Sequence, residues 1–310
     1  MSANPRVSVL INAYNGAAFL REAIESVYAQ TFSDFEIVLY DDASTDDTPN
    51  IAKSFDDKLR YFRSERQVPL GEARNNALEF CRGEFISFLD QDDLYLPEKL
   101  ARQVAAFSEG VGLVFSNSLR FWEADGREDL FYKSRPPDGD AFRQLLRAYY
   151  LPIHTVMIRR SALPSDRTWW FPEHFKMCEE SDLFLRIAYK YRIAYVDEIL
   201  AKYRVHGNNY SLTNREDLIK EPLEIIDRLS KLHPEFQEEY AEEIRAYRAD
   251  IKREEARGHW RRGNRYRTWR CYYESLRLNP RPVFLAELFL SFFLPYRAFP
   301  AIRSGVGRPL

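Results

Sequence analysis

Cysteine is scarce in this sequence. Only Cys81, Cys178 and Cys271 occur among 310 residues. Their number is odd and no two of them are close in the sequence, so we expect neither a disulfide framework nor a zinc site. Free thiols of this kind fit a reducing compartment such as the cytoplasm.

Long apolar runs are also missing. A helix needs about 20 consecutive apolar residues to span a bilayer, and the sequence has no such run. The first six residues lead directly into a strand-like segment, which is not the pattern of a secretory signal peptide. We therefore expect a cytoplasmic protein without a spanning helix.

Two glycine-rich motifs that bind phosphates are absent as well. No G-x-G-x-x-G follows the first strand-like run, and no P-loop with its lysine occurs. These motifs hold phosphates on backbone amides. Without them, a phosphate-bearing ligand has to be held by a metal ion and by side chains.

The net charge is only −2, but it is unevenly distributed. Residues 251–310 hold 13 Lys and Arg against 4 Asp and Glu, a net charge of +9, which leaves −11 for the rest of the chain. An acidic part suits metal binding, and a basic part suits an anionic surface. The basic part has no nucleic-acid-binding motif, so we do not expect nucleic acid as a partner.

The first 120 residues alternate between strand-like and helical patterns. Segments such as Phe19–Ala29 and Glu72–Cys81 have helical spacing and separate short apolar runs. Such βαβ alternation predicts a Rossmann-like α/β/α sandwich with a mainly parallel sheet. Further along, Asp125–Asp140 is interpreted as a loop, His154–Arg159 as a strand and Glu180–Tyr189 as a helix. The predicted strands of the first part are Val7–Ile11, Phe35–Tyr40, Leu59–Phe62, Phe85–Leu89 and Val111–Ser116.

Acidic side chains follow these strands, at the edge where open α/β sheets bind ligands. Asp42 comes after the second strand, and Asp90, Asp92 and Asp93 come after the fourth. Carboxylates so close together raise each other's pKa unless a cation bridges them. Mg²⁺ and Mn²⁺ take oxygen ligands from carboxylates and phosphates. We interpret the cluster as a metal–diphosphate site; the alternative is a solvated acidic turn before a helix.

Four segments of the chain resemble the motifs of family-2 glycosyltransferases, which have the GT-A fold. They span about residues 6–212 and follow the order of the family. The Gln-x-x-Arg-Trp motif of the processive branch is missing, so the resemblance favours a bacterial-type enzyme that adds a single sugar. The matching segments are Val7–Thr48, Gly71–Asp93, Cys178–Arg186 and Tyr203–Ser211.

The resemblance implies a donor site. Asn12, Tyr14 and Asp42 match positions that hold the nucleotide base, and Arg74 matches a position near the base and the phosphates. Asp90 matches the first acid of the DxD motif, which is expected near the ribose and the water shell of the metal.

The same resemblance implies a metal site. Asp92 matches the acid that binds the metal directly, and Asp93 is a supporting acid. Arg204 and His206 lie in a segment that closes over the diphosphate, where either can contact phosphate or metal. For His206 a purely structural role is the alternative.

Glu180 matches the catalytic base. The family usually has Glu-Asp here, whereas this chain has Glu179-Glu180, so the side chain of the base is one methylene longer. Asp182 is the fallback for this role. The alternative is that these acids only form the first turn of a helix, where the macrodipole favours negative charge.

The resemblance therefore implies an inverting, metal-dependent hexosyltransferase with Mg²⁺ or Mn²⁺ as cofactor. The expected donor is a UDP- or dTDP-sugar, and the expected acceptor is a glycan or a lipid-linked molecule in polysaccharide, lipopolysaccharide or glycoconjugate synthesis. Two alternatives remain open: another metal-dependent nucleotide enzyme such as a nucleotidyltransferase, and a non-catalytic carbohydrate-binding or scaffold protein.

The pattern beyond about Asn214 is helical, so we predict a catalytic domain over residues 1–214 and a helical region over 215–310. Trp260–Asn279 resembles one tetratricopeptide-like hairpin. The tail combines arginines, aromatics and the apolar Val283–Tyr296, which is typical of a segment at a membrane interface. This would place the protein peripherally on the inner face of the plasma membrane. The alternative is that the tail packs on the catalytic domain or in an oligomer.

Overall fold

The computed structural model describes residues 4–207 and 217–296. The chain divides into two compact units, residues 1–141 with 151–209, and residues 142–150 with 210–310. The boundary predicted at residues 214 and 215 lies outside the described residues.

The first unit is built on one sheet of nine strands. Its strands are β1 (Val7–Ala13), β2 (Phe35–Asp41), β3 (Leu59–Arg63), β4 (Phe85–Asp90), β5 (Leu94–Tyr95), β6 (Val111–Trp122), β7 (Glu128–Leu130), β8 (Met157–Arg159) and β9 (Arg192–Val205).

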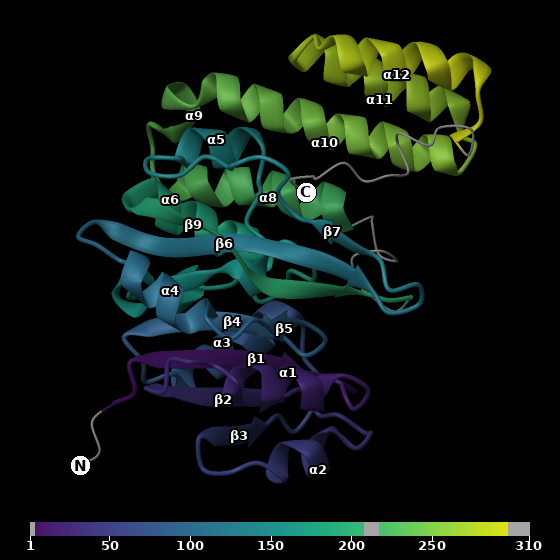
Figure 1. Cartoon of the computed structure of the whole chain (residues 1–310). Helices are drawn as coiled ribbons and strands as arrows, with labels where there is room; N and C mark the ends of the chain where they lie inside the picture. Colours follow the sequence, from purple (N-terminus) through teal and green to yellow (C-terminus); the bar gives the residue numbers. More distant parts are fainter. Residues whose placement is uncertain (1–3, 208–216, 297–310) are drawn as a thin grey trace. The chain divides into compact units, whose positions relative to one another are not determined.

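The strands lie in the order β3-β2-β1-β4-β8-β6-β9-β5, and β7 pairs with β6. The part from β3 to β4 can be followed in Figure 1. β1 is parallel to both β2 and β4, β2 is parallel to β3, and β6 is parallel to β9. β8 is antiparallel to β4 and to β6, so these two neighbours of β8 run in the same direction. The predicted α/β class with a mainly parallel sheet is confirmed.

Helices cover both faces of this sheet. They are α1 (Leu20–Tyr28), α2 (Thr48–Lys53), α3 (Leu70–Phe80), α4 (Lys99–Ala106) and α6 (Glu179–Lys190). Alternate side chains of β1 explain the two layers. Val9 and Ile11 belong to the core that includes α1, α2 and α4. On the other face, Phe88 of β4 packs against Phe184 of α6, with ring centroids 5.7 Å apart.

Three segments differ from the sequence prediction. The strand predicted at His154–Arg159 is wrong in its first half, because Ile153–Thr155 forms a 3₁₀ turn closed by the bond from the Thr155 amide to the Pro152 carbonyl. The loop predicted at Asp125–Asp140 contains β7, which forms a hairpin with β6. The long strand β9 was not predicted, although it leads to Arg204 and His206.

The second unit is helical, as predicted for the end of the chain. Its helices are α5 (Phe142–Arg147), α8 (Asp217–Leu232), α9 (Phe236–Glu239), α10 (Ala241–Arg261), α11 (Arg265–Leu278) and α12 (Pro282–Phe293). The tight turn between α10 and α11 has Gly263 at φ +74° and Asn264, whose side chain accepts the Arg267 amide at the start of α11. The two helices form a hairpin that begins earlier than the one predicted, because Trp260–Asn279 holds only the end of α10 and the whole of α11.

A buried carboxylate joins the last three helices. Glu287 of α12 accepts hydrogen bonds from Arg253 and Arg257 of α10 and from the Tyr272 hydroxyl of α11. Glu287 is 5% exposed and Arg257 is 3% exposed. Burial opposes the ionised form of Glu287, but the two guanidinium groups lower its pKa below the usual range. The carboxylate is therefore charged and paired.

None of the helices formed by the described residues is long and apolar enough to cross a membrane.

Removing the Glu287 carboxylate should destabilise the second unit. Glu287→Ala removes the carboxylate that pairs with the buried Arg257 and the half-buried Arg253, and the loss of one partner of a buried ion pair costs about 3–5 kcal/mol. Urea unfolding of the full chain measures this change. The matched control is Glu98→Ala, which breaks only an exposed pair with Arg102 and should change stability by about 1 kcal/mol or less. Equal stability of both variants would contradict the prediction.

Candidate active site

The carboxyl ends of the central strands bring the predicted residues together. In the register of the sheet, Asn12 at the end of β1 lies opposite Tyr40 of β2 on one side and Asp90 of β4 on the other. The amide oxygen and nitrogen of Asn12 are buried, and neither finds a hydrogen-bond partner among the described residues. Because buried polar groups are normally paired, Asn12 fits a site that is completed by a ligand.

The loops after β1 and β2 are tied to each other. The Thr45 amide donates to the side-chain oxygen of Asn15 at 2.8 Å, and the Asn15 amide donates to the Ser44 hydroxyl at 2.9 Å. Asn15 and Ala43 both have positive φ, at 49° and 59°. Strained backbone of this kind persists where surrounding contacts hold it, and it is frequent at binding sites.

Tyr14 is tied to the acidic motif after β4. Its backbone amide donates to the Gln91 side-chain oxygen at 2.9 Å, and the Gln91 side chain donates back to the Tyr14 carbonyl at 3.2 Å. Gly16 allows this approach, because a Cβ there would lie 2.2 Å from the Gln91 oxygen. The Tyr14 side chain itself is exposed.

Asp42 lies buried at the end of β2. Its carboxylate accepts hydrogen bonds from the Ser64 hydroxyl at 3.1 Å and from the Val68 amide at 3.1 Å. Burial raises the pKa of Asp42 above its usual range, and the bonds from Val68 and Ser64 act against this rise. The carboxylate of Asp42 is thus held in place at the edge of the sheet where β1 ends with Asn12 and Ala13.

Arg74 of α3 connects two predicted parts of the site. Its guanidinium donates to Asp90 at 2.9 Å and to Glu179, and it lies 4.0 Å from Glu180. Arg74 is 4% exposed. Burial alone would lower its pKa, but Glu179, Asp90 and Glu180 raise it above the usual value, so the guanidinium is charged. One cation therefore joins the first acid of the DxD motif to the start of α6.

Asp92 and His206 form a pair from two distant segments. The His206 Nε2 lies 2.8 Å from an Asp92 carboxylate oxygen, and the ring of Phe19 packs against the imidazole at 4.9 Å between centroids. Burial, followed by the charge of Asp90, raises the pKa of Asp92, while His206 lowers it. A cation near these groups would relieve the repulsion between the two carboxylates.

Asp93 has a different position from its two neighbours. It is fully buried, accepts the Arg204 backbone amide at 2.9 Å, and lies 3.4 Å from Nδ1 of His154. Burial, and then Asp92 and Asp90, raise the pKa of Asp93 well above its usual range. Burial and the nearby Lys99 lower the pKa of His154 to about 3, so His154 is neutral. Asp93 therefore anchors β9 to the loop after β4, through the backbone amide of Arg204.

Arg204 is held inside the first unit. It is 1% exposed, and its guanidinium binds Glu22 at 2.7 Å and Glu123 while a further N–H donates to the Asp92 carbonyl at 2.8 Å. The aromatic ring of Phe19 lies 4.6 Å from the guanidinium carbon. In this arrangement Arg204 positions the acidic motif, and its predicted contact with phosphate stays a prediction.

The two candidates for the catalytic base differ in their surroundings. The Glu180 side chain, at the start of α6, keeps 18% of its surface exposed. Burial, and then the charge of Glu179, raises the pKa of Glu180 well above its usual range, and Arg74 opposes this rise. Asp182 is fully buried and is ion-paired with Arg186 at 2.5 Å. The geometry favours Glu180 for contact with an acceptor.

Three residues with a structural part in the site were not assigned a role from the sequence. Gln91 lies within the acidic motif and bridges to Tyr14, Glu179 precedes the candidate base and binds Arg74, and His154 faces Asp93. The positions of Gln91 and Glu179 beside predicted site residues were a usable signal. His154 had none, because its partner is distant in the sequence.

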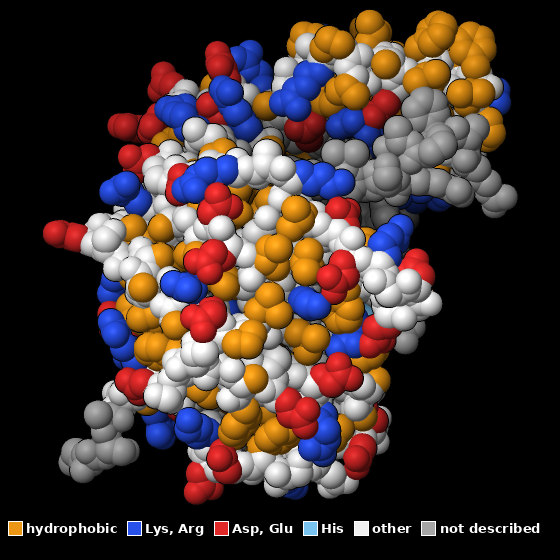
Figure 2. All heavy atoms as spheres, in the orientation of Figure 1, with side chains coloured by type: hydrophobic (Ala, Val, Ile, Leu, Met, Phe, Trp, Pro, Cys, Tyr) orange, Lys and Arg blue, Asp and Glu red, His pale blue; other side chains and the backbone are white. Residues whose placement is uncertain are grey.

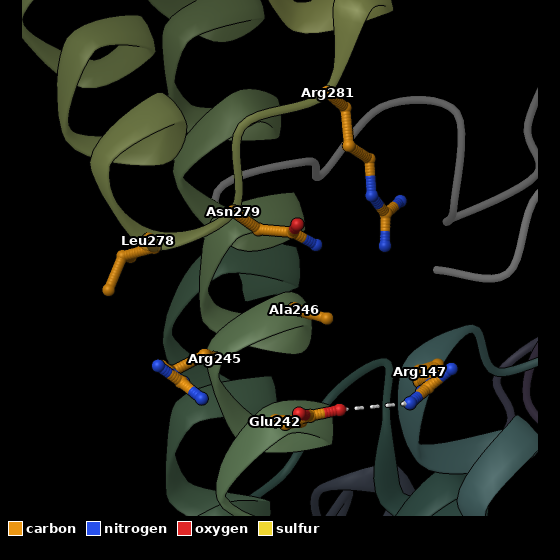
Figure 3. A pocket seen from close by; sticks show the side chains of 7 residues that line it. All are labelled: Arg147, Glu242, Arg245, Ala246, Leu278, Asn279 and Arg281. Carbon is orange, nitrogen blue, oxygen red and sulfur yellow. Dashed lines mark ion pairs between the residues drawn. The ribbon is translucent and has the colours of Figure 1, made fainter.

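A cavity of about 360 Å³ lies in the second unit (Figure 3). Arg147, Arg245 and Arg281 line it, and Arg147 is paired with Glu242 at 3.6 Å. The residues predicted to bind a donor or to catalyse transfer all belong to the first unit and do not line this cavity.

Comparison with known proteins decides the family. The sequence model described as glycosyl transferase family 2 matches residues 8–164. The chain belongs to glycosyl transferase family 2. An uncharacterised glycosyltransferase of Rickettsia typhi is 32% identical over 218 residues, which cover 66% of this chain and 65% of that protein. The Campylobacter jejuni GalNAc(5)-diNAcBac-PP-undecaprenol beta-1,3-glucosyltransferase is 30% identical over 207 residues, 65% of each chain. The matches thus span slightly less than two thirds of these relatives.

Solved structures show that this family-2 chain has the GT-A glycosyltransferase fold. Residues 1–349 of Staphylococcus aureus TarS, in complex with UDP-GlcNAc, match with a TM-score of 0.67 and 20% identity over 97% of this chain and 92% of that one. The mannosyltransferase PcManGT of Pyrobaculum calidifontis, in complex with GDP-Man and Mn²⁺, matches with a TM-score of 0.61 and 19% identity over 98% and 85%.

Replacing Arg74 should destabilise the first unit. Arg74→Met leaves the buried Glu179 carboxylate without its guanidinium partner, a loss of about 3–5 kcal/mol in the free energy of unfolding. Thermal and urea unfolding measure it. Arg102→Met is the matched control, because Arg102 pairs with Glu98 and Glu198 at the surface and should lose about 1 kcal/mol or less. A loss at Arg74 no larger than that of the control would show that the buried cluster is not held by this charge.

Proposed function

We propose that this family-2 protein transfers one sugar from a nucleoside-diphosphate sugar to an acceptor hydroxyl, with inversion at the anomeric carbon. The observation that carries the proposal is the contact of Arg74 with both Asp90 and the Glu179-Glu180 pair. The buried guanidinium of Arg74 thus lies between Asp90, the acid expected beside the donor, and Glu180, the candidate base. A donor and an acceptor bound there would meet between these groups.

The nucleotide is assigned to the edge formed by Asn12, Tyr14 and Asp42. The unpaired amide of Asn12 can donate and accept a hydrogen bond, and the Asp42 carboxylate can accept one from a ring N–H. Uracil and thymine both have such an N–H between two carbonyl groups. We assign UDP- or dTDP-sugars as donors, and the donor screen below separates them from GDP-sugars, since guanine also has a ring N–H. The similarity to TarS, which was solved with UDP-GlcNAc, supports a uridine nucleotide.

The residues that would hold a divalent cation are Asp92 and His206, with Asp90 beside them. The Asp92 carboxylate oxygen and the His206 Nε2 are 2.8 Å apart, which is close enough for both to bind one ion. A mixed carboxylate and imidazole pair suits Mn²⁺ better than Mg²⁺, which prefers oxygen ligands. Such an ion supplies positive charge that stabilises the departing diphosphate. PcManGT, a protein with a similar fold, was solved with Mn²⁺.

Glu180 is assigned as general base. Its carboxylate takes the proton of the acceptor hydroxyl while that oxygen attacks the anomeric carbon, and the bond from this carbon to the diphosphate oxygen breaks on the opposite face. One displacement of this kind inverts the configuration. The raised pKa of Glu180 makes it a stronger base than a solvent-exposed glutamate once it is ionised. Asp182 is less suited to the role, since Arg186 and burial separate it from an acceptor.

The acceptor class is proposed from similarity. The Campylobacter jejuni relative is named as an enzyme that acts on a diphosphate-linked undecaprenol glycan. We assign a glycan or lipid-linked acceptor here too, in the synthesis of a polysaccharide, lipopolysaccharide or other glycoconjugate. A lipid-linked acceptor would place the enzyme on the inner face of the plasma membrane.

A donor screen tests the proposed function. UDP-, dTDP- and GDP-sugars, and separately the nucleoside triphosphates, are each added with Mn²⁺, Mg²⁺ or EDTA, and the melting temperature and release of nucleoside diphosphate are measured. We expect at least one UDP- or dTDP-sugar to raise the melting temperature with Mn²⁺ and to lose this effect with EDTA. Asp92→Asn should lose the Mn²⁺-dependent part. Absence of any metal-dependent response would contradict the proposal, and a response to nucleoside triphosphates alone would indicate a nucleotidyltransferase.

The pH dependence of transfer tests Glu180. A base acts only when ionised, so kcat/KM should fall as the pH drops through the raised pKa of Glu180, at a higher pH than an ordinary glutamate would show. Glu180→Gln should keep donor binding and lose about 10²–10⁴-fold in rate. Glu180→Asp is the conservative control, which should keep part of the rate and the acid limb. Transfer by Glu180→Gln at the wild-type rate would remove Glu180 from this role.

A further inference from the structure

The last described helix, α12, directs large apolar side chains outward. Leu285 is 58% exposed, Phe289 62% and Phe293 68%, and Val283 and Phe292 are also exposed. Figure 2 shows hydrophobic side chains gathered over this helix. A contiguous apolar surface of this kind marks a site of interaction rather than an ordinary surface.

The opposite face of α12 is the more polar one. Glu287 is 5% exposed and Ser291 is 1% exposed, and both are buried against the neighbouring helices together with Phe284. A surface helix of a water-soluble domain normally has the reverse arrangement. The bonds from Arg253 and Arg257 to Glu287 fix this rotation, because turning the helix outward would break a buried ion pair. The apolar face is therefore held toward the outside.

Basic residues lie beside the apolar face. Trp269 of α11 stacks on Phe292, with ring centroids 4.3 Å apart, so the first turns of α11 adjoin the end of α12. Arg265, Arg267 and Arg270 are in these turns and are exposed. Over its whole length α11 has four arginines and one glutamate. Tyr266, 71% exposed, adds an amphipathic ring of the type enriched at membrane interfaces.

We propose that the outward face of α12, with the arginines of α11, binds the surface of an anionic lipid bilayer. A helix of 12 residues is about 18 Å long, too short to cross a hydrocarbon layer of about 30 Å. It can lie in the plane of the interface with Leu285, Phe289 and Phe293 among the acyl chains. The arginines then meet the lipid phosphates.

Charge complementarity selects the bilayer over a second copy of the chain. Two copies joined through this face would bring the arginines of their α11 helices together, and like charges across an interface oppose association. An anionic leaflet attracts the same arginines and accepts the aromatic side chains. The inference does not rest on the proposed sugar transfer, because binding is measured without donor or acceptor.

Vesicle binding by the full chain tests the proposal. Co-sedimentation is measured with vesicles of phosphatidylcholine alone and of phosphatidylcholine with 30% phosphatidylglycerol, at low and high salt. We expect wild-type protein to bind the mixed vesicles, with weaker binding at high salt and on pure phosphatidylcholine. F289E/F293E should bind about tenfold or more weakly. R265Q/R267Q should lose about fivefold for each arginine on the mixed vesicles only.

The matched control is L130E/I199E, which adds the same charges at two exposed apolar residues of the first unit and should bind like the wild type. Circular dichroism checks that all variants are folded. Failure of the wild-type protein to bind the mixed vesicles would overturn the proposal. So would equal loss in the control pair, or a wild-type dimer that F289E/F293E converts to a monomer without change in vesicle binding.

Discussion

The site of the first unit depends on one buried cation. Arg74 is nearly inaccessible to solvent and has carboxylates from two directions, Asp90 at the end of β4 and Glu179 with Glu180 at the start of α6. Without the guanidinium, the carboxylates would repel one another in a poorly hydrated place, where a lone charge costs several kcal/mol. With it, two segments that are about 90 residues apart in the sequence are held at a fixed separation. The charge of Arg74 also limits how far the pKa of Glu180 rises.

The three acids of the motif after β4 show how position separates chemically identical side chains. Asp90 binds Arg74, Asp92 lies against His206, and Asp93 is buried behind them on the backbone of β9. Asp90 and Asp92 keep part of their side chains exposed, whereas Asp93 has none of its surface exposed. The third contributes by fixing the strand that ends beside His206. Three neighbouring acids of one motif therefore have three different environments, and only Asp93 is fully buried.

The sequence alone predicted the α/β class, the positions of the early strands along the chain and the gathering of Asn12, Asp42 and Asp90 at one edge. These follow from local periodicity and from the rule that parallel strands end at the same side. Their individual roles came from family resemblance. What local patterns could not show were contacts between distant segments: the insertion of β8 between β4 and β6, the long β9, and the burial of Arg204 between Glu22 and Glu123. A basic residue in a segment that is predicted to close over a diphosphate gives no sign that distant acids will bind it.

The same limit applies to α12, and it explains why composition left two interpretations of the tail open. The apolar face of a helix with one glutamate can pack against its own domain or point to the surroundings. The number of hydrophobic residues in the helix is the same in both cases. The orientation is set by Glu287, because an ionised carboxylate on this helix is most stable where two guanidinium groups meet it. Burying the charged residue directs Phe289 and Phe293 outward. A polar contact, rather than the amount of apolar surface, decides which side of the helix is available to a partner.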